Sequence, residues 1–186
     1  MLIVKNEEYK LLRKHGEETY PHECCGVLIG TVVGDRRTVR RIVRCGNARA
    51  DRLNDRYTID PKELIAAQRE ARRDQLDIVG FYHSHPDHPA QWSSTDLAEA
   101  HWFGCSYVIT AVEKGHAAQT NSFALLGSFE EEKRFEVENI NVVTDDEEEE
   151  VSRIQTDTAA DQQRRLTPEA QDPERHRSQH PIGESR

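Results

Sequence analysis

With 186 residues, the chain has room for one ordinary domain and a tail, but not for two domains of usual size. Its formal net charge is −9, and residues 141–186 hold 12 acidic and 6 basic side chains, which leaves the preceding part of the chain close to neutral. Because non-specific nucleic-acid binding depends on cations that neutralise phosphates, this charge distribution argues against nucleic acid as a partner.

The composition favours a soluble cytoplasmic protein with no membrane segment. Residues 1–12 become charged too early to form a signal peptide, and no apolar run approaches the length of about 18 residues that a membrane span needs. The four cysteines, Cys24, Cys25, Cys45 and Cys105, show no C-x-x-C spacing. In a chain without a secretory signal, we expect them to be reduced thiols rather than a disulfide framework.

The first elements in chain order are a helix and a pair of strands. The helix begins with Asn6 as its N-cap and ends at Tyr20-Pro21, because a proline cannot continue it. An apolar run predicts a strand over residues 26–33, and apolar residues interleaved with polar ones predict a second strand over residues 37–43. Gly34-Asp35 between them is typical of a turn, so the two strands form a hairpin.

A second helix and a third strand follow. The helix starts at Asp60-Pro61, and Glu63 stands where it would complete a capping box with Asp60. Residues 78–85 are predicted to form a strand that Pro86 ends. The mixture of helices with hairpin-type strands predicts an α/β domain whose sheet is mixed rather than wholly parallel.

The remaining elements are one helix and two strands. The helix begins near Ser93-Ser94 and runs through His101-Trp102, and strands are predicted over residues 106–112 and 122–126 with a turn over residues 113–121.

The regular pattern stops after about Val143. Residues 145–150 are a block of like charges, and the segment beyond them is too polar to bury the apolar surface that would offset its ordering entropy. The sequence therefore predicts a folded domain over residues 1–140 and a disordered acidic and polar tail over residues 141–186. It leaves open whether this tail is a solvated extension or an interaction segment.

Two short segments place the residues of a metal site. His83-Ser84-His85-Pro86 ends the third strand, and Ser93-Ser94-Thr95-Asp96 opens the next helix. Side chains two apart on a strand point to the same face, so both imidazoles can reach one ion, and Asp96 in the first helical turn can point back at it. Two imidazoles and one carboxylate, with a fourth position left for water, form the ligand set of a catalytic zinc ion.

Several neighbouring residues need an interpretation of their own. We expect His88 at the rim of the site, His101 on the packed or the solvent face of its helix, and Ser84 in a structural role on the opposite face of the strand. A hydrolytic zinc site also needs a base. Glu23 directly precedes a strongly apolar strand. A charged carboxylate at such a position calls for an explanation, but the residues alone leave the role of Glu23 open.

These segments carry a resemblance to a known family. Residues 23–30, ECCGVLIG, and the H-S-H-P block with the spaced S-x-x-D are similar to the two signature blocks of the JAMM (JAB1/MPN/Mov34) zinc metallopeptidases. That pattern is a Glu before the first core strand, followed by H-S/T-H-P-x6-S-x-x-D, and every position is matched. The resemblance covers about residues 1–135 and implies a mixed curved β-sheet flanked by helices.

The resemblance also implies roles for individual residues. One zinc ion per chain would be bound by His83, His85 and Asp96, Glu23 would be the general base and then the general acid, and Ser93 would donate a hydrogen bond to the oxyanion. The chain looks like the short bacterial forms, which process ubiquitin-like sulfur-carrier proteins. The implied substrate is such a carrier or its amino-acid adduct, cut after a C-terminal Gly-Gly, for example with release of cysteine. A homodimer is compatible with the sequence, which does not fix the oligomeric state.

Two other functions compete with this interpretation. A non-catalytic MPN-like binding module, or a DNA-repair-associated JAMM-like protein, would need no metal. A zinc deaminase would need a P-C-x-x-C pair and an H-x-E block, and the sequence has neither.

Other features keep more than one interpretation. The basic strand over residues 36–44 is either a solvated edge or a docking patch for an acidic carrier. Tyr57 either contacts the peptide tail or packs in the core, and Trp92 is placed to line the mouth of the site. Cys24 and Cys25 are either buried small residues or redox-active thiols beside Glu23.

Overall fold

The computed structural model describes residues 1–48, 56–144 and 147. In chain order, these residues form β1 (Leu2–Lys5), α1 (Asn6–Thr19), β2 (Cys25–Val33), β3 (Arg36–Cys45), α2 (Pro61–Arg73), β4 (Asp77–Pro86), α3 (Ser94–Glu99), β5 (Ser106–Glu113), β6 (His116–Leu126), η1 (Glu130–Glu132), β7 (Arg134–Glu138) and β8 (Ile140–Val143). In these ranges, no helix has the length and apolarity needed to cross a membrane.

The predicted tail lies mostly outside the described residues. Within the predicted tail, the structure describes residues 141–144 and 147 only. Strand β8 runs across the predicted boundary at residue 140 and pairs with β1, so the ordered sheet extends at least to Val143. The division of the chain into a domain and a tail stays a prediction.

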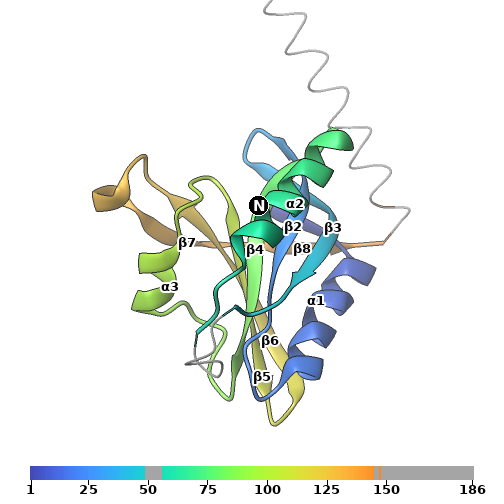
Figure 1. Cartoon of the computed structure of the whole chain (residues 1–186), viewed down its shortest axis with the longest axis vertical. Coiled ribbons are helices and arrows are strands. Elements are labelled where there is room, and N and C mark those ends of the chain that lie inside the picture. Colours follow the sequence, from blue (N-terminus) through green and yellow to red (C-terminus); the bar gives the residue numbers. More distant parts are fainter. Residues whose placement is uncertain (49–55, 145–146, 148–186) are drawn as a thin grey trace, which may run out of the picture. The chain divides into compact units, whose positions relative to one another are not determined.

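All the strands of the described residues belong to one sheet, in the order β7-β6-β5-β4-β2-β3-β1-β8. β1 is parallel to β3 and β8, β4 is parallel to β5, and the other neighbours are antiparallel. The two edge strands are consecutive in the chain, and the carbonyl of Asn139 between them accepts a hydrogen bond from the amide of Leu2 at 2.9 Å. Asn139 is thus the one residue between the two edge strands. Because so short a link holds the opposite edges close together, the sheet curls strongly (Figure 1). The predicted mixed, curved sheet flanked by helices is confirmed.

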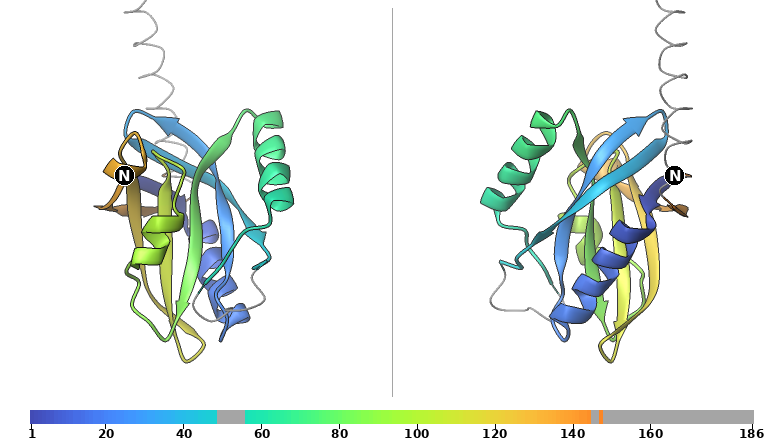
Figure 2. Two further views of the ribbon diagram at one scale, coloured as in Figure 1. Left: turned by 60° about the vertical axis from the view of Figure 1, so that its left-hand side comes forward. Right: turned by 90° about the vertical axis from the view of Figure 1, so that its right-hand side faces the viewer.

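The two long helices cover opposite faces of this sheet (Figure 2). Helix α1 contacts β1, β3, β4, β5, β6 and β8, and therefore lies in the hollow of the curl, where Leu12 packs against Leu28 of β2. Helix α2 contacts β2 and β4 from the outer face, where Ala71 packs with Val27 and Phe81. Burial on both faces explains why β2 reads as a continuous apolar run rather than an alternating one.

A buried ionic cluster crosses the hollow between strands far apart in the sheet. The guanidinium of Arg37 on β3 donates to Glu138 on β7 at 2.6 Å, and the same carboxylate accepts from the hydroxyls of Ser106 and Ser122 at 2.6 and 2.8 Å. Arg37 and Glu138 are only 9% and 7% exposed, and the amino group of Met1 also lies 3.1 Å from Glu138, so the buried carboxylate is compensated by two cations. The sheet order separates β3 from β7 by four strands, and the pair forms because the sheet curls.

The basic strand over residues 36–44 is therefore no solvated edge, and that interpretation was wrong. β3 pairs with β2 on one side and with β1 on the other. Arg37 is buried, Arg41 lies 2.7 Å from Asp74, and Arg44 lies 2.7 Å from Glu18. The prediction failed because β1 is too short for its four residues to identify it as a strand that covers β3.

The predicted helix starts are close to the observed ones, and Asp60 and Ser93 are N-caps as expected, but two details of the caps differ. Lys5, rather than Asn6, is the N-cap of α1. The carboxylate of Asp60 accepts from the amide of Lys62 at 2.8 Å, and the carboxylate of Glu63 accepts from the amide of Gly46 at 3.0 Å. Glu63 thus forms a tertiary contact with the segment after β3 in place of the expected capping box.

Two element lengths in the second half were also predicted wrongly. Helix α3 ends at Glu99 because the backbone of Ala100 is extended, so His101 lies beyond the helix. Strand β6 begins at His116 and leaves a tight turn after β5 instead of the long one expected over residues 113–121. Both ends are set by pairing and burial rather than by local propensity.

The side chain of His15 predicts a pH dependence of stability. Burial, followed by the positive charge of Arg44, lowers the pKa of His15 to about 4, and its Nδ1 lies 2.9 Å from the Tyr82 hydroxyl. Unfolding restores the ordinary pKa of 6.5, so the stability that His15 contributes is complete above about pH 6.5 and is lost as the pH falls toward 4. We expect His15→Gln to flatten the fall of the unfolding free energy across this window. Urea denaturation at several pH values measures it, with the exposed His116→Gln as the control, and equal slopes in all three proteins would contradict it.

Candidate metal centre

The sheet brings the predicted ligands to the face that α2 covers. On β4, Phe81 and His83 point to this outer face, and His85 follows with the same alternation. Ser84 points to the hollow instead, where it is fully buried and its hydroxyl accepts from the amide of Cys24 at 2.9 Å. The prediction that Ser84 is structural is confirmed.

Helix α3 brings Asp96 to the two histidines. Leu97 and Ala100 pack against the core of the outer face, and this packing fixes the short helix beside the end of β4. Ser93 is its N-cap: the Ser93 hydroxyl accepts from the amide of Asp96 at 3.1 Å, and the Ser93 amide donates to Asp96 Oδ2 at 2.6 Å. This reciprocal capping box holds the Asp96 side chain in one orientation.

The donor atoms of the three side chains face one another. His83 Nε2 lies 3.0 Å from His85 Nε2 and 3.3 Å from Asp96 Oδ1, and His85 Nε2 lies 3.7 Å from Asp96 Oδ2. In the described part of the chain, this is the one group of His, Cys, Asp and Glu side chains close enough to share an ion. Ligands of a tetrahedral zinc ion, at about 2.0–2.1 Å from the metal, are separated by about 3.3 Å, so the spacing and the donor types fit zinc.

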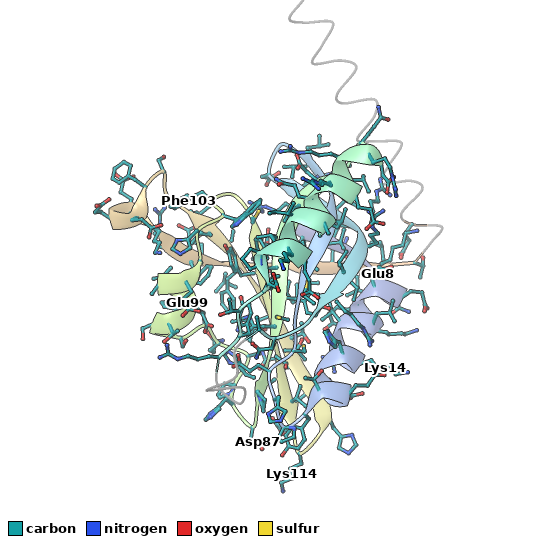
Figure 3. All side chains as sticks on the ribbon, in the orientation of Figure 1. Glu8, Lys14, Asp87, Glu99, Phe103 and Lys114 are labelled. Carbon is teal, nitrogen blue, oxygen red and sulfur yellow. The ribbon has the colours of Figure 1, made fainter. Side chains whose placement is uncertain are left out.

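Further hydrogen bonds orient His85. Its Nδ1 lies 2.9 Å from the carbonyl of Pro89, which as an acceptor places a proton on Nδ1 and leaves the lone pair of Nε2 directed at the site. Pro89 belongs to a loop that Asp87 anchors. The Asp87 carboxylate accepts hydrogen bonds from the Tyr20 hydroxyl and from the amide of Lys114, each at 2.8 Å. Figure 3 shows Asp87 and Lys114 together at one end of the domain.

The ring of Tyr57 holds His83 in place. The ring of Tyr57 stacks on the imidazole of His83 with a centroid distance of 4.6 Å, and it also packs against the core of the outer face. The side chain of Asn47 fixes this segment, because its amide donates to the carbonyl of Arg56 at 2.8 Å and its oxygen accepts from the amide of Thr58 at 3.2 Å. The packing interpretation of Tyr57 therefore holds, and Asn47 is a supporting residue that the sequence pattern did not reveal.

The electrostatics of the group favour a positive charge among the three donors. Burial opposes the ionisation of Asp96, but the hydrogen bonds from His83 and His85 outweigh it and hold the pKa of Asp96 well below its usual range. Burial lowers the pKa of His83, so this imidazole is neutral and able to coordinate. For His85, burial is outweighed by hydrogen bonds to Asp96 and Pro89, which raise its pKa. Carboxylate and neutral imidazole are the forms in which these residues bind metals, so these shifts favour the binding forms of Asp96 and His83, whereas His85 would have to give up its extra proton to a bound metal.

Strand pairing places Glu23 next to this group. Cys25 pairs with His83, and the amide of Ser84 donates to the carbonyl of Cys24 at 3.2 Å. The same antiparallel register puts Glu23 across from His85 on the outer face. Glu23 is only 5% exposed, and its negative charge contributes to the raised pKa of His85.

A pocket of about 430 Å³ opens at this point of the molecule. Four of the five predicted site residues line it: Glu23, His85, Ser93 and Asp96. His88 lies on its wall, as expected for a rim residue, and Trp92 is also there. The remaining lining residues are Arg56, Pro89, Gln91 and Thr95. His101 lies elsewhere, 3.0 Å from Glu130 and beyond the end of α3.

The cysteines contribute no donor to this group. All four are buried free thiols, as expected for a reduced protein. Burial raises the pKa of Cys24 to about 11 and raises the pKa of Cys25 further, so both thiols stay protonated and poorly nucleophilic. The structure thus favours the interpretation of Cys24 and Cys25 as buried small residues over redox-active ones.

Comparison with known proteins assigns the family. Residues 6–126 match the model of the prokaryotic homologs of the JAB domain, so the chain belongs to this family of JAB-domain proteins.

The chain is also similar to proteins that are named for an activity. It is 38% identical over 89 residues to a desampylase of Haloferax volcanii, an alignment that covers 48% of this chain and 62% of the relative. It is 34% identical over 90 residues to a probable TtuB-protein conjugate cleaving protease of Thermus thermophilus, covering 48% of this chain and 57% of the relative. The alignments span about six-tenths of the length of these two relatives.

A solved structure supports the fold. The chain superposes on the solution structure of protein DSY2949 from Desulfitobacterium hafniense with a TM-score of 0.67 at 26% identity, covering 78% of this chain and 94% of that one.

Proposed function

We propose that the chain is a zinc-dependent peptidase or isopeptidase that hydrolyses the amide bond after the C-terminal Gly-Gly of a ubiquitin-like sulfur-carrier protein. The observation that carries the proposal is the meeting of three metal-type donors, a buried carboxylate and a helix-capping serine around one pocket. The two relatives named as a desampylase and as a conjugate-cleaving protease support the same class of reaction.

His83, His85 and Asp96 would hold one zinc ion per chain, with a fourth position left open for water. When bound, zinc supplies Lewis-acid chemistry and lowers the pKa of a coordinated water toward about 7. The protein prepares this ion site by fixing the His85 ring through Pro89 and the Asp96 carboxylate through Ser93.

Glu23 would act as the proton carrier of the reaction. Its carboxylate takes a proton from the attacking water while the water oxygen bonds to the scissile carbonyl carbon. The same proton then passes to the leaving amine nitrogen as the carbon–nitrogen bond breaks. The register that pairs Cys25 with His83, continued by two residues, supports this role, because Glu23 would then stand beside the donor group where both transfers would occur.

Ser93 would stabilise the oxyanion that forms on the carbonyl oxygen. A serine hydroxyl has one hydrogen to donate and accepts separately. The Ser93 oxygen accepts from the amide of Asp96, so its hydrogen is directed away from the helix. Ser93 also lines the pocket, where it would face the carbonyl held against the ion.

The Gly-Gly tail suits this pocket because glycine has no Cβ and lets the backbone approach the donor group closely. Buried free thiols are compatible with the reducing cytoplasm in which we propose that the reaction takes place. A binding module without catalysis would not need the preoriented donor set, and a zinc deaminase would need cysteine donors that this group lacks in the described residues.

Replacement of Glu23 tests the proton-transfer step. We expect Glu23→Gln to lower kcat for a carrier–amino-acid adduct by about 10²- to 10⁴-fold, because an amide cannot accept the proton. Zinc content and thermal stability should match those of the wild type, and the exposed Glu131→Gln provides a control of equal charge change. Product release is followed by mass spectrometry of the carrier. Full activity of Glu23→Gln would remove this residue from the mechanism.

Replacement of Ser93 separates its two roles. We expect Ser93→Ala to lower kcat by about 10²- to 10³-fold while zinc stays bound, because the backbone amide of residue 93 still donates to Asp96. Ser93→Thr keeps the hydroxyl and should recover most of the activity, and Ser94→Ala serves as the neighbouring control. Loss of zinc in proportion to the loss of activity would show that Ser93 acts as the helix cap alone.

A further inference from the structure

Arg56 gives the pocket a feature that the proposed reaction does not use. The lining residues include two with carboxylates, Glu23 and Asp96, and one with a permanently charged side chain, Arg56. An arginine that only keeps the protein soluble could lie anywhere on the surface, so its place on the wall of the pocket with the reacting groups calls for an explanation. The position of Arg56 therefore points to an anion that enters the pocket with the substrate.

The fold fixes the backbone at the carbonyl of Arg56 and in the residues that follow it. Its carbonyl accepts from the side-chain amide of Asn47 at 2.8 Å. The next residue, Tyr57, is held by its stack on His83, and the amide of Thr58 is held by the Asn47 oxygen. Asn47 and Ile59 also form a β-bridge. Arg56 is thus presented from a segment anchored on a candidate metal ligand, so its position relative to the donor group is defined.

The leaving group of the proposed reaction decides which anion can reach Arg56. When a carrier is joined to the α-amine of a single amino acid, the released residue bears a carboxylate two bonds from the amine nitrogen. When a carrier is joined to a lysine side chain, the ε-amine is remote from any carboxylate of that residue. The first leaving group brings its negative charge into the pocket, and the second does not.

The charges of the pocket affect how well it binds a leaving group with a carboxylate compared with one without. The charge of a bound zinc ion would already be offset by Asp96 and Glu23, so a further free carboxylate beside Glu23 would need another cation in this partly desolvated place. An arginine guanidinium matches a carboxylate with two parallel hydrogen bonds, a stronger and more directional contact than a lysine makes.

We propose that Arg56 binds the carboxylate of the leaving amino acid, so that the protein prefers carriers extended by a single α-linked residue over carriers joined to a lysine side chain. This inference rests on the proposed function and names its substrate class. Arg56 is a specificity residue in it, whereas Glu23 and Ser93 perform the chemistry.

The test uses the zinc-loaded full chain and three matched substrates. All carry the same ubiquitin-like sulfur-carrier protein ending in Gly-Gly, extended by alanine, by alanine carboxamide, or by the ε-amine of a lysine peptide. The alanine and its carboxamide differ only in the charge of the leaving group. We expect kcat/KM of the wild type to be at least about tenfold higher for the free carboxylate than for the carboxamide, in keeping with a charge-assisted bidentate contact. The lysine-linked substrate should resemble the carboxamide.

Variants assign the preference to Arg56. Arg56→Gln should bring the ratio of carboxylate to carboxamide close to one, with kcat/KM for the carboxamide kept, and Arg56→Lys should restore part of the ratio. Arg69→Gln, an exposed site on α2 with the same charge change, should leave the ratio unchanged. His88→Gln tests the other rim residue and should also leave it unchanged.

The outcomes separate this inference from the proposed function. Equal cleavage of all three substrates by the wild type would overturn the inference alone. A loss of all activities by the same factor in Arg56→Gln would show that Arg56 only supports Glu23 or the pocket, and would overturn it too. Cleavage of none of the carriers by the wild type would overturn the proposed function and the inference with it.

Discussion

The pairing of β2 with β4 is the constraint on which the site depends. The antiparallel register sets Cys25 opposite His83, and the alternation of side chains then places both histidines and Glu23 on the outer face. A shift of this register by one residue would turn either the two histidines or Glu23 into the hollow that α1 fills, and so would separate them. Burial on both faces of the sheet makes such a shift costly, so the same packing that stabilises the fold also positions the chemistry.

The curl of the sheet supports this pairing from a distance. The buried pair of Arg37 and Glu138, with two serine hydroxyls, joins strands that are far apart in the sheet order. A buried pair stabilises little in net terms, yet the loss of one partner leaves an uncompensated charge. We interpret this cluster as the feature that selects the curled form, in which α1 is enclosed and the outer face is left to α2, α3 and the pocket.

Local signals predicted the central part of this arrangement well. The H-S-H-P block ends β4 as expected, and the start of α3 follows from its capping serine, because strand alternation and helix caps are encoded by neighbouring residues. The resemblance to the JAMM pattern located Glu23, which the residues alone did not assign. Strands β1, β7 and β8 were not predicted, since strands of only four or five residues carry little local pattern and gain their structure from pairing with other strands.

Long-range contacts also explain the other failures. Glu63 bonds to Gly46 instead of capping its own helix, and Asn47 anchors the segment of Arg56 and Tyr57. Neither contact has a local signature, because each joins residues whose proximity exists only after folding. The supporting residues of the site are for this reason less visible in the sequence than the donors themselves.

Zinc X-ray absorption on the purified full chain, together with the metal content per chain, tests the central claim most directly. The account predicts one zinc per chain with only nitrogen and oxygen neighbours at about 2.0–2.2 Å, and loss of the metal in the double variant His83→Ala/His85→Ala. A zinc content no higher than in that variant, or sulfur neighbours at about 2.3 Å that indicate cysteine ligands, would contradict it.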